Sequence, residues 1–473
     1  MSIFSTIQGL ITQFFRGEVR QEFVDVQPMA FPSTESAITR CFRAYQGTPD
    51  WIDPEDNIKS INFAKAVCGE IARLVTLGIS IKVDGSPRAD WLQEQVDRMF
   101  FQLRQWDEYA NAYGLVILKP NMDLVDLYTP GEYTVTNLTG GKITGAVFKT
   151  RETSPDGKRY FTRLEYHYFD DAGVYHIVNR CFVSQSANSK GEPISIDNTP
   201  WAGLDEETTV TGLERPLFSP LRTPGANNRD INAPLALPIF ADALEELKDL
   251  DIAYSRNARE IFDSARTVLL DSDRLLTGLT AGNPTPGKYQ AAAQRMKLPD
   301  YVRIVEGDGM NSGGVYQEIN PTLNTDARLT GLNALLSQIG YKCGFSNGYF
   351  VFNEQTGIAT ATQVEADQQR TIQLIKDCRD QLENCLNDLL YALDKLADLY
   401  DLAPAGAWEV NFDFGDITYS YEADKQQWWA YVQSGKMPPW RYWAKFEGFT
   451  EEEAKAIQAE MTPKEPTLFG SEE

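Results

Sequence analysis

The longest uninterrupted helical pattern in this sequence runs from Ile358 to Leu402, a stretch without glycine or proline. At 1.5 Å per residue, an unbroken helix of this length spans more than about 60 Å, far more than an ordinary globular helix. Its apolar residues recur at helical spacing: Ala361, Val364, Ile372, Ile375, Cys378, Leu382, Leu386, Leu389, Leu393 and Leu396. The fold must therefore accommodate one long rod, which Pro404 and Gly406 are expected to end.

A glycine-bearing loop, SNGYFVFNEQTG, comes directly before the rod. No Lys or Arg occurs between Lys342 and Arg370, so the loop carries no positive charge. Its glycines permit hinge motion. Taken alone, the segment fits an ordinary surface loop between two helices as well as a functional loop.

The rest of the pattern predicts an α+β chain. After a polar, proline-marked N-terminal arm, helical spacing predicts helices over 61–78 and 91–114, each ending at a glycine and followed by a strand. From Leu124 to Ser184 the chain is β-rich, with short runs of Tyr, Val, Phe and Thr between GG, PDG and DAG turns. This half of the chain should form a mixed α+β domain.

The second half begins after a proline-rich border at 216–238. Helices are predicted over 238–270 and 325–344, and YVRIV and VYQEI between them suggest a short hairpin. WEVNFDFGDITYS alternates as a strand. The C-terminal stretch predicts a compact helical module whose small core is supplied by four tryptophans: Trp428, Trp429, Trp440 and Trp443.

Composition restricts the possible partners. Lys and Arg total 44 against 67 Asp and Glu, a formal net charge of −23, which disfavours tight, non-specific binding to nucleic acid. The six cysteines form no CxxC pair and are expected to be core thiols in a reducing compartment. The N-terminal segment lacks the features of a signal peptide, and no apolar run reaches the length of a spanning helix. We therefore expect a soluble, cytoplasmic protein without a membrane partner.

Signatures of catalysis are mostly missing from the sequence. It contains no phosphate-binding loop, and His167 and His176 are too few for an ordinary zinc site, so structural roles are favoured for both. Glu409, Asn411 and Asp413 share one face of the predicted strand and, with Asp416, are weak candidates for binding Ca²⁺ or Mg²⁺. A solvated strand face is the favoured interpretation. We expect no cofactor and no enzymatic activity.

Several stretches, in order, resemble the portal proteins of tailed bacteriophages, in the class of long-tailed viruses with non-contractile tails. The resemblance covers the chain from about Asn57 to Glu460, and no single motif carries it. Three stretches are the most similar: INFAKAVCGEIARLVTLGISIKV, PLFSPLRTPGANNRDINAPLALPIFADALEELKDLDIAYSRNAREI and GFSNGYFVFNEQTGIATATQVEADQQRTIQLI.

The resemblance implies a subunit of a ring, typically of twelve copies, at one capsid vertex, with DNA passing through the central channel. It implies a mixed α/β wing, long stem helices, a small α/β clip, a long kinked helix and a helical crown. Mapped onto this sequence, the segments are an N-terminal arm at 1–35, the wing at 36–237, stem helices at 238–270 and 326–343, the clip at 271–325, the tunnel loop at 344–357, the long helix at 358–402, a strand returning to the wing at 403–422, the crown at 423–461 and a flexible tail at 462–473.

The same resemblance assigns roles to particular residues. The tunnel loop would face DNA through Asn347, Tyr349, Phe350, Phe352, Asn353, Glu354 and Gln355, and would hinge at Gly344, Gly348 and Gly357. The clip would face a packaging motor through Arg274, Lys288, Arg295, Lys297 and Arg303. An acidic channel wall suits sliding DNA, since each cation paired with phosphate adds friction.

The implied partners are double-stranded DNA, the terminase large subunit, head-completion or adaptor proteins, and the major capsid and scaffolding proteins. The chain would be assembled in the host cytoplasm and remain in the virion. Two alternatives stay open: a metal-dependent hydrolase using Glu409, Asp413 and Asp416, and a helical adaptor protein that binds other proteins.

Overall fold

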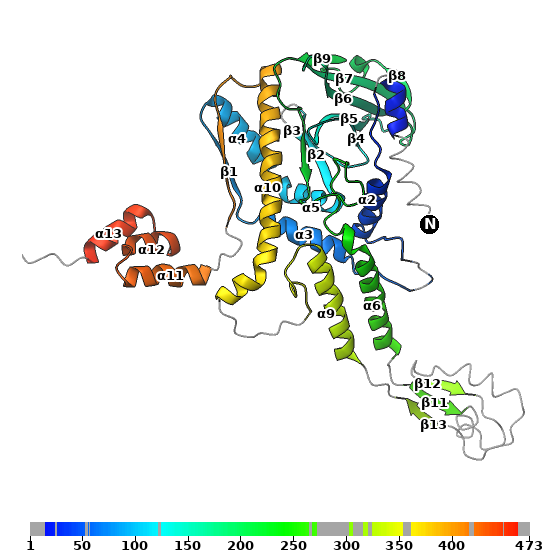
Figure 1. Ribbon diagram of the computed structural model, residues 1–473, viewed down its shortest axis with the longest axis vertical. Helices are drawn as coiled ribbons and strands as arrows, with labels where there is room; N and C mark the ends of the chain where they lie inside the picture. The colour runs from blue at the N-terminus through cyan, green and yellow to red at the C-terminus, as the bar shows by residue number, and fades with distance from the viewer. Residues whose placement is uncertain are drawn as a thin grey trace, which may run out of the picture. The chain divides into compact units, whose positions relative to one another are not determined.

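A computed structural model describes residues 15–23, 26–52, 55, 57–121, 124–263, 267–271, 302–305, 316–319, 324–352, 361–415, 421–447 and 449–461 (Figure 1). Long helices and small, mostly antiparallel sheets confirm the predicted α+β class. The chain divides into two compact units, one of Met1–Val75 with Lys82–Val410 and one of Thr76–Ile81 with Asn411–Glu473. Of the predicted tail, residues 462–473 lie outside the described part.

The described part of the N-terminal segment packs against the β-rich region, which a polar arm would not do. Residues 15–22 are helical, and the helix α2 (Pro32–Tyr45) follows. Phe15, Val19 and Phe23 are buried against strands of the largest sheet. Because these apolar side chains cover one face of that sheet, the helix at residues 15–22 and Phe23 contribute to its core.

The first α+β region follows the predicted order, with one difference. Its elements are α3 (Phe63–Val75), β1 (Ser80–Asp84), α4 (Pro87–Met99), the 3-10 turn η1 (Phe100–Gln102), α5 (Leu103–Tyr113) and β2 (Leu115–Asn121). The single helix predicted over 91–114 is wrong, because η1 divides it. The helical spacing of buried apolar residues continues from Met99 to Leu103, so the sequence pattern could not reveal the 3-10 turn between them. Gly114 ends α5 as predicted, with a φ of 84°.

The β-rich region forms two antiparallel sheets. The six-stranded sheet has the order β4-β5-β6-β7-β8, with β9 pairing β7 beside β8, and the three-stranded sheet has the order β10-β2-β3. Their strands are β3 (Leu124–Tyr128), β4 (Tyr133–Thr139), β5 (Lys142–Thr153), β6 (Tyr160–Phe169), β7 (Tyr175–Ser184), β8 (Glu192–Ile194), β9 (Glu207–Val210) and β10 (Ser219–Arg222); a short 3-10 turn, η2 (Ile196–Asn198), follows β8. The predicted β runs are confirmed.

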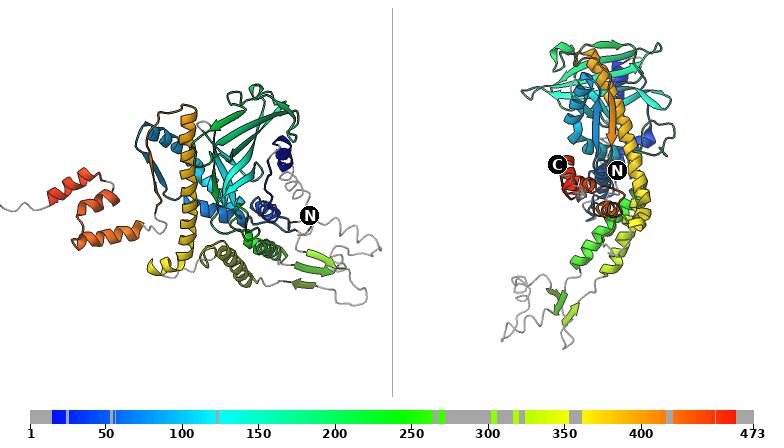
Figure 2. Two further views of the ribbon diagram at one scale, coloured as in Figure 1. Left: turned by 45° about the horizontal axis from the view of Figure 1, so that its top comes forward. Right: turned by 90° about the vertical axis from the view of Figure 1, so that its left-hand side faces the viewer.

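Two helices, α6 (Leu244–Asp263) and α9 (Thr325–Lys342), pack side by side (Figures 1 and 2). A 3-10 turn, η3 (Ala241–Ala243), leads into α6. The helix predicted to reach residue 270 ends at Asp263, because the β-branched run that starts at Thr267 forms β11 (Thr267–Asp271). β11 lies between β12 (Val302–Val305) and β13 (Tyr316–Ile319). The predicted hairpin is therefore wrong, since its two strands each pair with β11 and not with each other.

The predicted rod is confirmed as α10 (Ala361–Leu399), one helix of 39 residues. Both views show it bending near its N-terminal end (Figures 1 and 2). It ends three residues before the predicted end at Leu402, and Asp401 just beyond has a left-handed φ of 52°. Ala392 and Leu396 of α10 pack against Tyr175 and Leu217 of the β-rich region.

The C-terminal unit contains α11 (Tyr421–Gln433), α12 (Pro439–Phe446) and α13 (Glu451–Met461), as the predicted helical module requires. Its core differs from the prediction. Tyr442, Phe446 and Ala454 are buried, whereas Trp429 is 42% exposed and the other three tryptophans are half-buried. The tryptophan rings pack at the rim of this core, where Trp428 contacts Phe446 at 5.6 Å between ring centroids.

All six cysteines are buried and free, which confirms the prediction of core thiols. None of the described helices is both long enough and apolar enough to cross a membrane.

Candidate functional site

The candidate loop begins where α9 ends. Its first half, from Gly344 to Phe352, is described, whereas the predicted residues Asn353, Glu354, Gln355 and Gly357 lie outside the described part of the chain. Asn347 and Phe352 are exposed, and Phe352 is exposed to 52%. The described half therefore offers one amide and one aromatic ring to the solvent.

An aromatic cluster fixes the middle of this half-loop. Phe345 is fully buried, and its ring lies 4.8 Å from each of Tyr349 and Phe350, measured between centroids. Phe350 also contacts Phe63 of α3, edge to face, at 5.0 Å. Tyr349 and Phe350, both predicted to face DNA, are half-buried in this cluster. Their rings thus hold the loop against α3.

Polar contacts add to this anchoring. The Tyr349 hydroxyl donates to a carboxylate oxygen of Glu70, which also accepts hydrogen bonds from Arg73. The bonds from Arg73 and Tyr349 outweigh burial and lower the pKa of Glu70. The Ser346 amide donates to the Thr371 hydroxyl at 2.8 Å, joining the loop to α10. The loop is therefore bound to α3 and α10 at its start.

Two of the three predicted hinge glycines have conformations that favour glycine. The φ angles of Gly344 and Gly348 are 95° and 77°, in the left-handed region. A Cβ on Gly344 would lie 3.1 Å from Leu374 Cδ1, so close packing adds a second reason for glycine there. These angles explain the residue type, and hinge motion stays a prediction.

Replacing Tyr349 with phenylalanine should loosen the start of the loop. The variant keeps the ring contacts but loses the hydrogen bond to Glu70, at a cost of about 1 kcal/mol. Amide hydrogen exchange at residues 346–350 should therefore become roughly fivefold faster.

Tyr341→Phe is the matched control, because the Tyr341 side chain is 55% exposed and its ring packs under the Arg370 guanidinium, a contact that phenylalanine retains. Equal exchange rates in both variants would show that the bond to Glu70 does not hold the loop.

Two buried arginines fix the long helix behind the loop. Arg379 of α10 donates to the carbonyl oxygens of Leu74 and Val75, at the end of α3. Arg88 of α4 binds the turn at the other end of α10, where it donates to the Ala403 carbonyl at 2.8 Å. Leu74 and Val75 are the last residues of α3, and Ala403 lies just beyond the end of α10. Carbonyl groups at such helix ends have no hydrogen-bond donor within the helix. The arginines thus secure α10 to both α3 and α4.

Ion pairs join the two helices α6 and α9. Lys342 of α9 pairs with Glu246 of α6 at 2.6 Å and donates to the Asp242 carbonyl. Arg328 of α9 pairs with Glu260 near the other end of α6. Because Lys342 and Glu246 are partly exposed, this pair contributes little to stability but sets the register of the two helices.

The predicted clip residues are mostly beyond what the structure describes. Arg274, Lys288, Arg295 and Lys297 lie outside the described ranges, and Arg303 lies on β12, where its backbone is opposite Leu269 of β11. The described residues therefore do not test whether this basic set lies together, and its role stays a prediction.

The weak metal candidates lie on β14 (Glu409–Asp413), which pairs with β1. Glu409, Asn411 and Asp413 are exposed and alternate with half-buried residues, as predicted, while Asp416 lies outside the described part. Within the described residues, no group of three or more His, Cys, Asp or Glu is placed to hold a metal ion.

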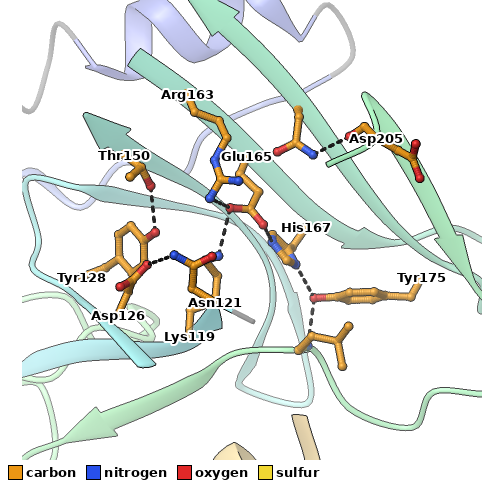
Figure 3. A network of polar contacts seen from close by, with 12 residues as sticks. Lys119, Asn121, Asp126, Tyr128, Thr150, Arg163, Glu165, His167, Tyr175 and Asp205 are labelled. Atoms are coloured by element: carbon orange, nitrogen blue, oxygen red, sulfur yellow. Dashed lines mark hydrogen bonds and ion pairs between the residues drawn. The ribbon is translucent and has the colours of Figure 1, made fainter. Parts of the chain in front are cut away.

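A buried polar network in the β-rich region was not predicted as a unit (Figure 3). Glu165 of β6 accepts hydrogen bonds from Lys119 and His167, each at 2.9 Å, and pairs with Arg163 at 3.0 Å. Burial opposes ionisation of this carboxyl, but the two cations and the bond from His167 hold the pKa of Glu165 well below its usual range. The carboxylate is therefore charged at neutral pH.

The hydrogen-bond order fixes the tautomer of His167. The ionised Glu165 can only accept, so His167 Nε2 donates to it. Nδ1 of the neutral ring then accepts from the Tyr175 hydroxyl, which itself accepts from the Leu217 amide at 2.9 Å. Burial lowers the pKa of His167, so the imidazole is neutral. This confirms the predicted structural role of His167. The alternation of Arg163, Glu165 and His167 along β6 was the one available signal of the network.

No protein-family profile and no curated protein matches the chain. Two solved structures are similar over 92% of it, "Neck of empty GTA particle computed with C6 symmetry" and "Neck of native GTA particle computed with C12 symmetry". They are 10% identical, the match covers 99% and 98% of their chains, and the TM-score is 0.44 for both. Likeness at this level does not establish a shared fold or function.

Proposed function

We propose that this chain is the subunit of a ring through which double-stranded DNA passes at one vertex of a viral capsid. The observation that carries the proposal is the loop between α9 and α10, which is anchored at its start and is followed by a 39-residue helix. No Lys or Arg occurs from residue 343 to residue 369, which covers the loop and the first turns of α10. The sequence resemblance to phage portal proteins supports it. The same channel would serve DNA packaging and ejection.

The negative net charge of the chain favours a channel through which DNA slides over a protein that binds DNA tightly. Affinity for DNA comes largely from Lys and Arg paired with phosphates. A net charge of −23 and a cation-free loop give weak attraction, which suits DNA that must slide. Asn347 would contact the passing duplex without holding it.

Apolar side chains on the stem helices support assembly. Tyr254 and Ile261 of α6 are 38% and 53% exposed, and Tyr341 of α9 is 55% exposed. A heterologous interface between neighbouring copies would cover such side chains. Copies related by such an interface form a closed ring when the rotations between them add up to one full turn. We propose a cyclic homo-oligomer of about 12 subunits.

The other assignments follow the resemblance. The segments named above as wing, stem, clip and crown would hold those places in the ring. The clip would bind the terminase large subunit during packaging and a head-completion protein afterwards, and capsid and scaffolding proteins would surround the ring. The subunit would assemble in the host cytoplasm, act in the virion and catalyse no reaction, since a separate ATPase would drive translocation.

Electron microscopy of the purified protein tests the ring. Class averages should show closed rings of about a dozen subunits with a hole wide enough for duplex DNA. Compact monomers or dimers at every salt and protein concentration would contradict the proposal.

An aspartate at the exposed Ile261 should reduce the fraction of rings at least tenfold, because a charge would be buried in the interface without a partner. Ile231→Asp is the matched control, since Ile231 is 89% exposed and lies outside both α6 and α9. Rings that persist in the Ile261 variant would show that this face of α6 is not part of the interface.

A further inference from the structure

A small cavity adjoins the buried polar network of Figure 3. Its volume is about 40 Å³, and its polar lining includes Lys119, Arg163, Glu165, His167, Asn179 and Tyr400. A water molecule needs about 10–15 Å³ of such volume. The cavity therefore accepts a few water-sized species and is too small for a nucleotide or a sugar.

The groups around the cavity do not balance in charge. Lys119 and Arg163 are cations, 2% and 1% exposed, and Glu165 is the carboxylate that they share. His167 is neutral. Asp205 also contributes to the lining, but Figure 3 shows its carboxylate directed away from Arg163. Asp205 is exposed, so solvent screens its charge. Among the buried groups of the lining, two cations therefore share one carboxylate, and water does little to screen the remaining positive charge.

Arg163 has donors that the described residues do not satisfy. Its Nη2 contacts Glu165, and the ring of Trp201 lies against the guanidinium, with 5.2 Å from Cζ to the ring centroid. Nε and Nη1 have no hydrogen-bond partner within the described part of the chain. A buried, charged donor without a partner is costly, so this site favours a ligand that accepts hydrogen bonds and carries negative charge.

We propose that the cavity binds a small monovalent inorganic anion of the chloride class, held by the guanidinium of Arg163 and the ammonium of Lys119. Lys119 donates one hydrogen bond to Glu165, and its ammonium can donate two more. Asn179 Oδ1 lacks a partner among the described residues and, as an acceptor, would repel the anion directly. It accepts instead from a water molecule that shares the cavity. The site does not depend on ring formation.

Thermal unfolding of the full-length protein tests the proposal. At equal ionic strength, sodium chloride should raise the apparent Tm above that in sodium gluconate by roughly 2–4 °C, and the gain should saturate with chloride concentration. Arg163→Met should lose this difference. Arg159→Met is the control, because Arg159 is exposed near the start of the same strand, and it should keep the difference. Equal Tm values in both salts for the wild type would overturn the proposal.

Bromide supplies a second test that needs no variant. Anomalous diffraction from wild-type crystals soaked in sodium bromide should show a peak between Arg163 and Lys119. Its absence, with only water density there, would overturn the proposal even if Arg163→Met failed to fold.

Discussion

Replacing Arg88 with methionine should lower the free energy of unfolding by about 3–5 kcal/mol. The Arg88 side chain is 1% exposed, and its guanidinium satisfies the turn that ends α10. It donates to the carbonyl oxygens of Asp394, Ala403 and Pro404 at 2.7–2.9 Å, and to the carboxylate of Asp398. Methionine fills part of the volume but donates no hydrogen bond. Three carbonyl groups would lose this donor.

A shift of the urea midpoint measures this loss. Arg98→Met on the same helix is the matched control, because Arg98 and its partner Glu94 are 44% and 57% exposed. An exposed pair of this kind is worth at most about 1 kcal/mol. If the urea midpoint fell by the same amount in both variants, Arg88 would contribute no more to stability than an exposed arginine does.

The role of Arg88 could not be read from the sequence, although the helix that it secures could. The rod was predictable because a run without glycine or proline with apolar residues at helical spacing has few other solutions. Arg88 lies 306 residues before Asp394, and no local pattern marks an arginine as buried. Periodicity predicts an element, whereas the partner of a buried charge depends on tertiary packing.

The predicted hairpin failed for a related reason. YVRIV and VYQEI have the composition of strands, and both are strands, but the TVLLD run that separates them in the sheet was assigned to the preceding helix. Val268 fits a helical face and a strand equally well by spacing. Strand order depends on contacts distant in the sequence, so the correct elements gave the wrong pairing.

For the candidate loop, the sequence predicted the position and the glycines but not the anchoring. The aromatic residues of SNGYFVFNEQTG were expected to face DNA, yet Tyr349 and Phe350 pack toward α3. Their partners, Phe63 and Glu70, lie nearly three hundred residues earlier. An aromatic side chain suits a channel wall and a core equally, and only the fold distinguishes the two.

Raising the pH from about 4 to 8 should destabilise the folded chain through one buried carboxyl group, that of Asp107 on α5. Burial raises its pKa to about 7 from an ordinary value of 3.8, and a hydrogen bond from Asn111 at 3.0 Å only partly offsets this. The neighbouring thiols of Cys68 and Cys378, on α3 and α10, are themselves buried and neutral. Within the described part of the chain, no cation offsets the charge of the Asp107 carboxylate.

The sign follows from proton binding. Between pH 4 and 7 the folded chain keeps a proton on Asp107 that the unfolded chain has lost, so each rise in pH favours the unfolded chain. A shift of about three pKa units corresponds to a loss on the order of 4 kcal/mol by pH 8. Asp107→Asn removes the titrating group and can still accept from Asn111. The variant should therefore match the wild type near pH 4 and exceed it in stability at pH 8.

Urea unfolding at pH 4, 6 and 8 measures the difference between variant and wild type, which cancels the titration of all other groups. Asp97→Asn is the control, because Asp97 is exposed on α4 and hydrated in both states. A constant difference for Asp107→Asn across this range would mean that Asp107 does not change protonation on folding. A difference that grows with pH would show that ionisation of Asp107 on α5, which packs against α3, lowers the stability of the folded chain.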